Sequence, residues 1–387
     1  MHAVTSWPAA GVSAMAVAMS LGTLLIGCAG GGDVQDSDGG DFADASYEAD
    51  LGTGPDTSDT FAGPDGDHAE TGDGRGEGFV GEPGDLVPVP PETPAVPDIP
   101  TKPEAPVVPL VCHPIVGGWS TIEINGIWRG FTVQMPADTS NMALLFLWHG
   151  FLQLPDQFAT TIVYDVPSRQ WVRFDPNGFP MPLMIVTPWD LKILPPAGLD
   201  WDIVSGDIDL PFFDGMLECI RQQFSIDDSR IYSFGFSAGA VFSNLLSAIY
   251  PNLFAATISE SGTWFNDQAQ WSEVLIPIIQ WQWPPFDPAD GGNILLTHGG
   301  PRDFATIISL EAATRKALPF LHHNGRTVTE CAHTFGHTLD PDLTQSMYYE
   351  WMWAHQRGGP PLGGLLPSFP SVERPVGATS CRFHPAR

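Results

Sequence analysis

Five short, continuously apolar runs constrain the fold of the second half of the chain more than any other feature. Each run is typical of a strand that is buried on both faces of a sheet, and segments with helical periodicity lie between the runs. Strands that alternate with helices form a mostly parallel sheet with helices on both faces. We therefore predict a doubly wound α/β fold from the runs MALLFLWHG (142–150), PLMIVTPW (182–189), RIYSFGF (230–236), FAATISES (254–261) and NILLTHGG (293–300).

An antiparallel hairpin and three helices complete this prediction. Residues 120–136 alternate apolar and polar side chains around Asn125-Gly126, a strong signal for a two-residue hairpin turn. Apolar residues recur every three or four positions in 209–224, which predicts an amphipathic helix. Later helices are predicted at 303–321 and 342–356.

The first 28 residues contain no Asp, Glu, Lys or Arg and end in LLIGC. This segment resembles a bacterial lipoprotein signal, which implies cleavage before Cys28 and a lipid on its sulfur, so that the protein contacts a membrane through this anchor. The positive charge that such signals carry near their start is missing. An uncleaved membrane anchor or an ordinary secretory signal is the alternative.

Residues 29–107 are predicted to be a disordered, acidic, Pro/Gly-rich tether. They hold 19 acidic and two basic residues and few large apolar side chains, so burial cannot offset the entropy cost of ordering them. The words DSDGGD and GPDGDH resemble calcium loops but lack a complete ligand set, and solvated acidic chain is the preferred interpretation. Since the whole chain carries a net charge of −29 and no Lys/Arg cluster, nucleic acid is excluded as a partner.

Residues 108–387 are expected to form one catalytic domain. Besides Cys28, the chain has an even number of cysteines, which predicts two disulfides in an exported protein. No CxxC word or close Cys/His quartet is present, so no metal site is predicted. The four cysteines are Cys112, Cys219, Cys331 and Cys381.

The word GFSAG at 235–239 follows the apolar run RIYSFGF and precedes AVFSNLLSAIY. In a chain with 41 glycines the word alone is weak evidence. A strand that ends at Gly235 or Phe236, then Ser237, then a helix from Ala238, is however the context in which a strained turn presents a serine hydroxyl. Ser237 is therefore the candidate nucleophile, with a purely structural turn as the alternative.

A serine nucleophile needs a base and an orienting carboxylate, which on this fold follow it in the order acid, then histidine. Asp303 follows a buried-strand pattern in a Gly-rich loop and is the candidate acid, with a helix N-cap as its alternative role. His337, in a turn-like loop, is the candidate base. Less favoured acids and histidines are Asp340, Asp342, His333, His322 and His323.

Two backbone N–H groups are the candidate donors to the oxyanion of an acyl-transfer intermediate. One belongs to Ala238, at the start of the helix after the serine. The other belongs to Phe151, in the loop after the strand LLFLW, where Gly150 shapes the turn. His149, beside it, is interpreted as a buried structural histidine.

The segments LFLWHGFLQ, SIDDSRIYSFGFSAGA, LLTHGGPRD and FGHT resemble, in this order, the extracellular α/β-hydrolases that include polyhydroxybutyrate depolymerases and feruloyl or acetyl-xylan esterases. The similarity covers about residues 119–356. It implies hydrolysis of carboxylic esters, polymeric ones included, outside the cytoplasm through an acyl-enzyme and without a metal or organic cofactor. The matching positions are Ser237 as nucleophile, Asp303 as acid and His337 as base.

Two departures from the family pattern concern the predicted site. Phe151 stands where the family's loop carries a cysteine, and the segment from His298 to Asp303 is one residue longer than the family's acid motif.

Trp264, in a loop after a strand, is a predicted substrate contact. The fold that the resemblance implies favours one of three disulfide pairings, Cys112 with Cys219 and Cys331 with Cys381.

Two other functions stay open from the sequence. A serine peptidase or lipase on the same fold shares the triad chemistry. A noncatalytic module that binds a surface glycan or polymer in an aromatic cleft represents a different class of protein.

Overall fold

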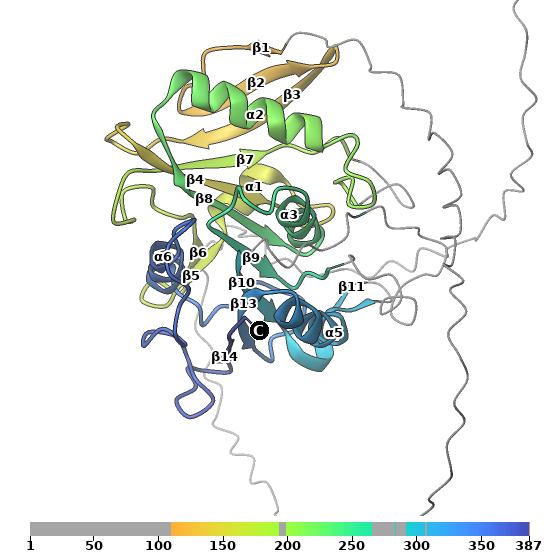
Figure 1. Ribbon diagram of the computed structural model, residues 1–387, viewed down its shortest axis with the longest axis vertical. Helices are drawn as coiled ribbons and strands as arrows, with labels where there is room; N and C mark the ends of the chain where they lie inside the picture. The colour runs from red at the N-terminus through yellow and green to blue at the C-terminus, as the bar shows by residue number, and fades with distance from the viewer. Residues whose placement is uncertain (1–109, 193–198, 265–282, 284–291, 306–307, 387) are drawn as a thin grey trace, which may run out of the picture. The chain divides into compact units, whose positions relative to one another are not determined.

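The computed structural model describes residues 110–192, 199–264, 283, 292–305 and 308–386. In this part of the chain a ten-stranded mixed sheet has the order β1-β2-β3-β7-β4-β8-β9-β10-β13-β14 (Figure 1). Its strands are β1 (Val111–Cys112), β2 (Gly118–Ile124), β3 (Ile127–Gln134), β7 (Leu183–Pro188), β4 (Met142–Trp148), β8 (Ile226–Phe236), β9 (Ala256–Glu260), β10 (Gly292–His298), β13 (Arg326–Ala332) and β14 (Ser380–His384). Two small two-stranded sheets pair β5 (Val163–Asp165) with β6 (Gln170–Val172) and β11 (Phe304–Ala305) with β12 (Ile308–Ser309).

The predicted hairpin is confirmed. Strands β2 and β3 pair antiparallel, and the turn between them has φ of 51° at Asn125 and 79° at Gly126. Positive φ at both central residues is the geometry of a type I′ turn, which matches the right-handed twist of the strands. The hairpin extends the sheet away from the parallel strands that carry the predicted site.

The middle of the sheet is parallel, from β7 through β4, β8, β9 and β10 to β13. The predicted α/β-hydrolase fold, doubly wound with an N-terminal antiparallel hairpin, is therefore confirmed. The helices are α1 (Pro155–Thr160), α2 (Leu210–Gln223), α3 (Ala238–Ile249), α5 (Leu310–His323) and α6 (Gln345–Ala354), with a short 3₁₀ helix η1 (Gly300–Arg302).

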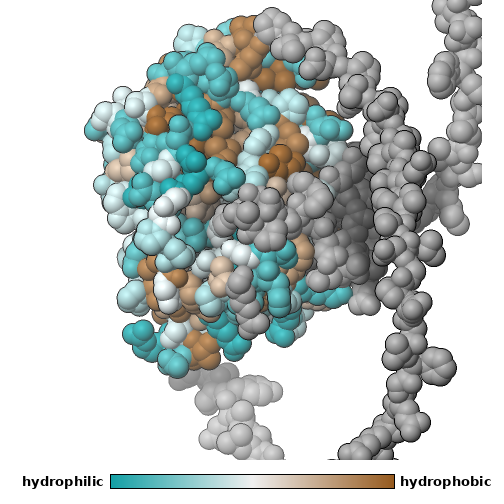
Figure 2. Space-filling view, in the orientation of Figure 1, coloured by the Kyte–Doolittle hydropathy of each residue, from teal (hydrophilic) through white to brown (hydrophobic). Residues whose placement is uncertain are grey.

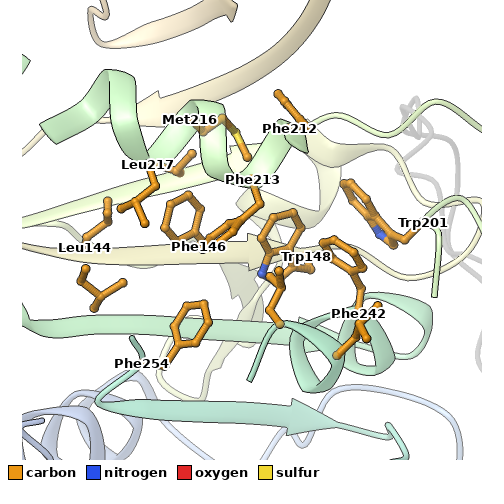
Figure 3. Close-up of a cluster of buried hydrophobic side chains, with 14 of the residues drawn as sticks. Leu144, Phe146, Trp148, Trp201, Phe212, Phe213, Met216, Leu217, Phe242 and Phe254 are labelled. Atoms are coloured by element: carbon orange, nitrogen blue, oxygen red, sulfur yellow. The ribbon is translucent and has the colours of Figure 1, made fainter. Parts of the chain in front are cut away.

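Helices cover both faces of the sheet, which explains why its strands read as continuous apolar runs. Along β4, Leu144, Phe146 and Trp148 enter a core that also contains side chains of α2, α3 and α5. Figure 3 shows these residues with labelled side chains of α2 and α3. The intervening residues of β4 enter a second core with side chains of α1 and α6. A fully buried β4 thus fixes the sheet between two helical layers.

Two of the predicted helices begin later than their sequence pattern indicates. The helix predicted from residue 303 begins at Leu310, because residues 304–305 pair with 308–309 and Ser309 caps the helix by accepting a hydrogen bond from the Ala312 N–H. The helix predicted at 342–356 spans only Gln345–Ala354, with Thr344 as its N-cap.

Both disulfides form. Cys112 of β1 is bonded to Cys219 of α2, and Cys331 of β13 is bonded to Cys381 of β14, directly opposite it in the antiparallel ladder. This is the pairing that the family resemblance implied. Disulfides persist in oxidising compartments, which indicates a protein that works outside the cytoplasm.

The predicted signal (1–28) and tether (29–107) lie outside the described residues. Over the face shown in Figure 2, hydrophobic and hydrophilic residues of the described part are interspersed. None of the helices in the described ranges is long and apolar enough to cross a membrane.

Candidate active site

Ser237 occupies a strained turn between β8 and α3. Its backbone has φ of 54° and ψ of −120°, while β8 ends at Phe236 and α3 begins at Ala238. A non-glycine residue rarely adopts positive φ, and such strain is characteristic of functional turns. The Ser237 N–H donates to the Glu260 carbonyl oxygen of β9 at 2.9 Å, which ties the turn to the neighbouring strand.

The two glycines of GFSAG are required by close backbone contacts. A Cβ on Gly235 would lie 2.2 Å from the carbonyl oxygen of Gly239. A Cβ on Gly239 would lie 2.1 Å from the carbonyl oxygen of Trp148, at the end of β4. Strand, turn and helix can therefore pass one another only where no side chain is present.

The structure brings Ser237, His337 and Asp303 together. The Nε2 atom of His337 lies 2.9 Å from Ser237 Oγ, and its Nδ1 atom lies 2.7 Å from Asp303 Oδ1. The imidazole stacks against the ring of Phe236, with centroids 5.0 Å apart. In this arrangement Asp303 orients the ring with its proton on Nδ1, which leaves Nε2 free to accept the proton of the serine hydroxyl.

Asp303 is completely buried, and its second carboxylate oxygen is also occupied. Oδ2 accepts hydrogen bonds from Ser261 Oγ and from the Gly299 N–H, both at 2.8 Å. The alternative role of Asp303 as the cap of a long helix is wrong, because Ser309 caps α5 instead.

The other candidate acids and bases lie elsewhere. Asp340 accepts from Thr379 Oγ1 at 2.8 Å, and Asp342 accepts from the Ala378 N–H at 2.8 Å. His333, the less favoured candidate base four residues before His337, follows β13 and is buried, which lowers its pKa to about 4. His322 and His323 end α5.

The predicted oxyanion donors flank Ser237. A Cβ built on Gly150 would lie 3.2 Å from Ser237 Cβ, so the turn of residues 149–153 passes directly beside the serine. Ala238 is the first residue of α3, where the N–H has no acceptor within the helix. Among the described residues, the Phe151 N–H also has no hydrogen-bond acceptor.

Side chains from two segments hold this turn. Gln153 Oε1 accepts from the Gly150 N–H at 2.7 Å. Asp200 Oδ2 accepts from the N–H of Leu152, a residue with φ of 61°, at 2.5 Å. Trp201 Nε1 donates to the carbonyl oxygen of His149 at 2.9 Å. Of the residues that fix the turn, Asp200 and Trp201 lie outside the sequence motifs, whereas Gln153 ends the segment LFLWHGFLQ.

Trp264 does not match its predicted role as a substrate contact. Its side chain is completely buried, in the same hydrophobic core as Trp148, and its ring lies 6.3 Å from that of Trp283. A fully buried indole has no surface to offer a ligand, so Trp264 belongs to the hydrophobic core instead.

Glu260, Ser261 and Asp200 are the site residues that sequence reasoning missed. Glu260 is fully buried between the hydroxyl groups of Thr297 (2.6 Å) and Tyr348 (2.8 Å), and burial raises its pKa to about 8. Glu260 and Ser261 do end the run FAATISES, and polar residues at the carboxyl end of a buried strand are a usable signal. Nothing in the local pattern of Asp200 connects it to a turn 48 residues earlier.

A doubly wound, mostly parallel sheet with a serine on a strained turn between a strand and a helix defines the α/β-hydrolase fold. The structures of native sOPH and native pOPH share it, with TM-scores of 0.54 and 0.52 at 15% and 16% identity. These alignments cover 70% and 71% of this chain, and 95% and 96% of the two solved chains.

Sequence comparison narrows this class. Acetylxylan esterase A of Aspergillus oryzae is 25% identical over 194 residues, which are 44% of this chain and 60% of the relative. Feruloyl esterase D of Neurospora crassa is 30% identical over 152 residues, 37% of this chain and 48% of the relative. No family model matches the chain. The chain thus has the α/β-hydrolase fold and is similar in sequence to acetylxylan and feruloyl esterases. It spans about 60% of the length of the first curated relatives it matches.

Proposed function

We propose that the chain is a serine hydrolase of carboxylic esters. The observation that carries this proposal is the 2.9 Å contact between Ser237 Oγ and His337 Nε2, in a ring whose other nitrogen lies 2.7 Å from the buried Asp303. Serine is a weak nucleophile near neutral pH, and an adjacent oriented base is what activates it.

The reaction proceeds in two halves. Ser237 Oγ attacks the ester carbonyl carbon while His337 Nε2 takes the hydroxyl proton, and the N–H groups of Ala238 and Phe151 stabilise the oxyanion. His337 then protonates the departing alcohol as the acyl-enzyme forms. Water, deprotonated by His337, attacks the acyl-enzyme, and the proton returns to Ser237 as the acid is released.

Labelling of Ser237 tests the mechanism directly. A fluorophosphonate probe is expected to modify Ser237 of the folded protein, as mass spectrometry of the labelled peptide would show. Ser237→Ala is expected to abolish labelling and p-nitrophenyl acetate turnover, whereas Ser243→Ala, a buried serine hydrogen-bonded to Ser233, keeps both. A folded wild-type protein that is not labelled would favour the noncatalytic binding module instead.

The proposed substrates are acetyl or feruloyl esters of polysaccharides, with polyhydroxyalkanoates as a further polymeric ester. The names of the sequence relatives support the first two, since they are acetylxylan and feruloyl esterases. Comparison of kcat/KM on acetylated xylan, methyl ferulate, a hydroxybutyrate oligomer, a long-chain triglyceride and a peptide tests this choice. A preference for the triglyceride or the peptide would contradict it.

We also propose that Cys28 carries a lipid anchor and that residues 29–107 form the tether that joins it to the hydrolase domain. The segment lacks the Lys or Arg that lipoprotein signals usually carry near their start. Cleavage is nevertheless expected at the LLIGC sequence that ends at Cys28. Mass spectrometry of the mature amino terminus tests the proposal. An unmodified residue 28, or an uncleaved segment, would contradict it.

A further inference from the structure

Three buried side chains with metal-ligand chemistry lie beside the 149–153 turn. His149, Asp190 and Asp200 each offer one donor atom, and these atoms all lie within 4.8 Å of one another. The side chains of His149 and Asp200 have no exposed surface, and that of Asp190 is only 3% exposed. None of the three takes part in the proton transfers of the proposed hydrolysis.

The hydrogen bonding of His149 leaves a lone pair directed at this cluster. Its Nδ1 atom lies 2.9 Å from the Gly150 carbonyl oxygen, which can only accept, so Nδ1 carries the proton. Nε2 lies 3.9 Å from Asp190 Oδ2 and has no hydrogen-bond partner among the described residues. Asp200 Oδ1, likewise buried, has no hydrogen-bond partner there either. Buried polar atoms without partners are costly and require a specific explanation.

The two carboxyl groups of the cluster lie beside a single ammonium group. Lys192 Nζ lies 2.9 Å from Asp190 Oδ2 and 3.8 Å from Asp200 Oδ2, so one ammonium group faces two carboxylates. The Lys192 side chain is 51% exposed and can turn into solvent. A divalent cation in its place would neutralise both carboxylates and give Nε2 a partner.

We propose that His149, Asp190 and Asp200 bind a divalent transition-metal ion such as Zn²⁺. One imidazole and two carboxylates with a fourth position open toward Lys192 suit a four-coordinate zinc ion, whereas Ca²⁺ needs six to eight oxygen ligands. Bonds of about 2.1 Å at tetrahedral angles place neighbouring donors about 3.4 Å apart. The three donors lie within 4.8 Å of one another and His149 Nε2 lies 3.9 Å from Asp190 Oδ2, so shifts of about 0.5 to 1.4 Å would bring them to this spacing.

The ion would act on the structure of the turn rather than on a substrate. Asp200 binds the Leu152 N–H through Oδ2, and His149 and Gly150 belong to the same turn. Metal binding would thus join residues 190 and 200 to the segment that carries the Phe151 N–H. The site does not depend on whether the protein hydrolyses esters.

Zinc binding to the chelator-treated, full-length protein tests this inference. Isothermal titration with Zn²⁺ and metal analysis after dialysis are expected to give one tightly bound ion per chain. Asp190→Asn is expected to weaken binding at least about 100-fold. Lys192→Gln removes the competing ammonium group and is expected to tighten binding by roughly 2- to 5-fold. These two variants keep the buried His149 and Asp200, and circular dichroism verifies that they are folded.

His384→Gln is the matched control, because His384 also pairs with a carboxylate, Glu330, at 3.1 Å but lies outside the cluster. It should bind Zn²⁺ like the wild type. The inference is overturned if the wild type binds no stoichiometric ion, if Asp190→Asn binds as tightly as the wild type, or if Lys192→Gln binds more weakly. Equal affinity for Ca²⁺ would overturn the assignment to a transition metal.

Discussion

Ser261 Oγ donates a hydrogen bond to Asp303 Oδ2 at 2.8 Å, and Ser261 itself has a backbone φ of 50°. Two strained serines therefore lie at the carboxyl ends of adjacent strands, Ser237 after β8 and Ser261 after β9. Ser237 contacts the histidine, while Ser261 holds the carboxylate that orients the same ring. The acid is fixed from two sides, since the Gly299 N–H binds the same oxygen.

Replacement of Ser261 by Ala is expected to lower kcat for p-nitrophenyl acetate by about 3- to 10-fold with little change in KM. A hydrogen bond to a charged group contributes about 1.5 to 3 kcal/mol, and the Gly299 N–H retains part of this restraint. Ser259→Ala is the control, because that buried serine accepts a hydrogen bond from Asn244 and does not contact Asp303. Equal kcat values for the two variants would show that Ser261 does not position the acid.

Gly239→Ala is expected to destabilise the protein by about 3 kcal/mol or more. The new methyl group would overlap the Trp148 carbonyl oxygen, which belongs to a buried central strand and cannot move aside. Gly117→Ala is the control, since its Cβ would meet only the Met135 side chain, 3.6 Å from Cγ and 3.9 Å from Cβ. Urea unfolding measures both variants, and similar midpoints would contradict the close contact.

Gln153→Ala is expected to reduce kcat by about tenfold or more. The Gln153 side chain accepts a hydrogen bond from the Gly150 N–H, and this contact fixes the position of the neighbouring Phe151 N–H. Loss of an oxyanion donor costs about 100- to 1,000-fold, and a displaced donor loses part of that. Gln157→Ala, on the exposed side of α1, should keep wild-type kinetics. A Gln153 variant with raised KM and unchanged kcat would point to substrate binding instead.

The sequence predicts those parts of the fold and site that depend on local pattern. Continuous apolar runs, the Asn125-Gly126 turn and the glycines around Ser237 reflect steric and burial constraints that act within a few residues. The chain order of acid and histidine on this fold led to Asp303 and His337. Trp264 was misjudged because a loop position near a site does not reveal whether the indole points outward or into the core. The contact between Asp200 and Leu152 depends on how distant segments pack, which no local pattern records.

Glu260→Gln is expected to remove the contribution of Glu260 to the pH dependence of stability. Burial raises the pKa of Glu260 to about 8 and that of the nearby Asp340 to about 7, against ordinary values of 4.5 and 3.8. Between pH 4.5 and 8 the folded protein therefore retains a proton on Glu260 that the unfolded chain releases. The contribution of each such group to the free energy of unfolding therefore falls as pH rises between its two pKa values, by about 1.4 kcal/mol per pH unit.

Glutamine mimics the protonated acid and does not titrate, so the difference in the free energy of unfolding between the wild type and the variant should change by about 1.4 kcal/mol per pH unit between pH 5 and 8. Below pH 4.5 Glu260 is protonated in both the folded and the unfolded wild type, so the two curves should run parallel there. Urea unfolding at each pH measures the slopes. If the curves stay parallel up to pH 8, Glu260 is ionised in the folded protein, and Thr297, Tyr348 and the Asp340 N–H then stabilise a buried carboxylate rather than a neutral acid.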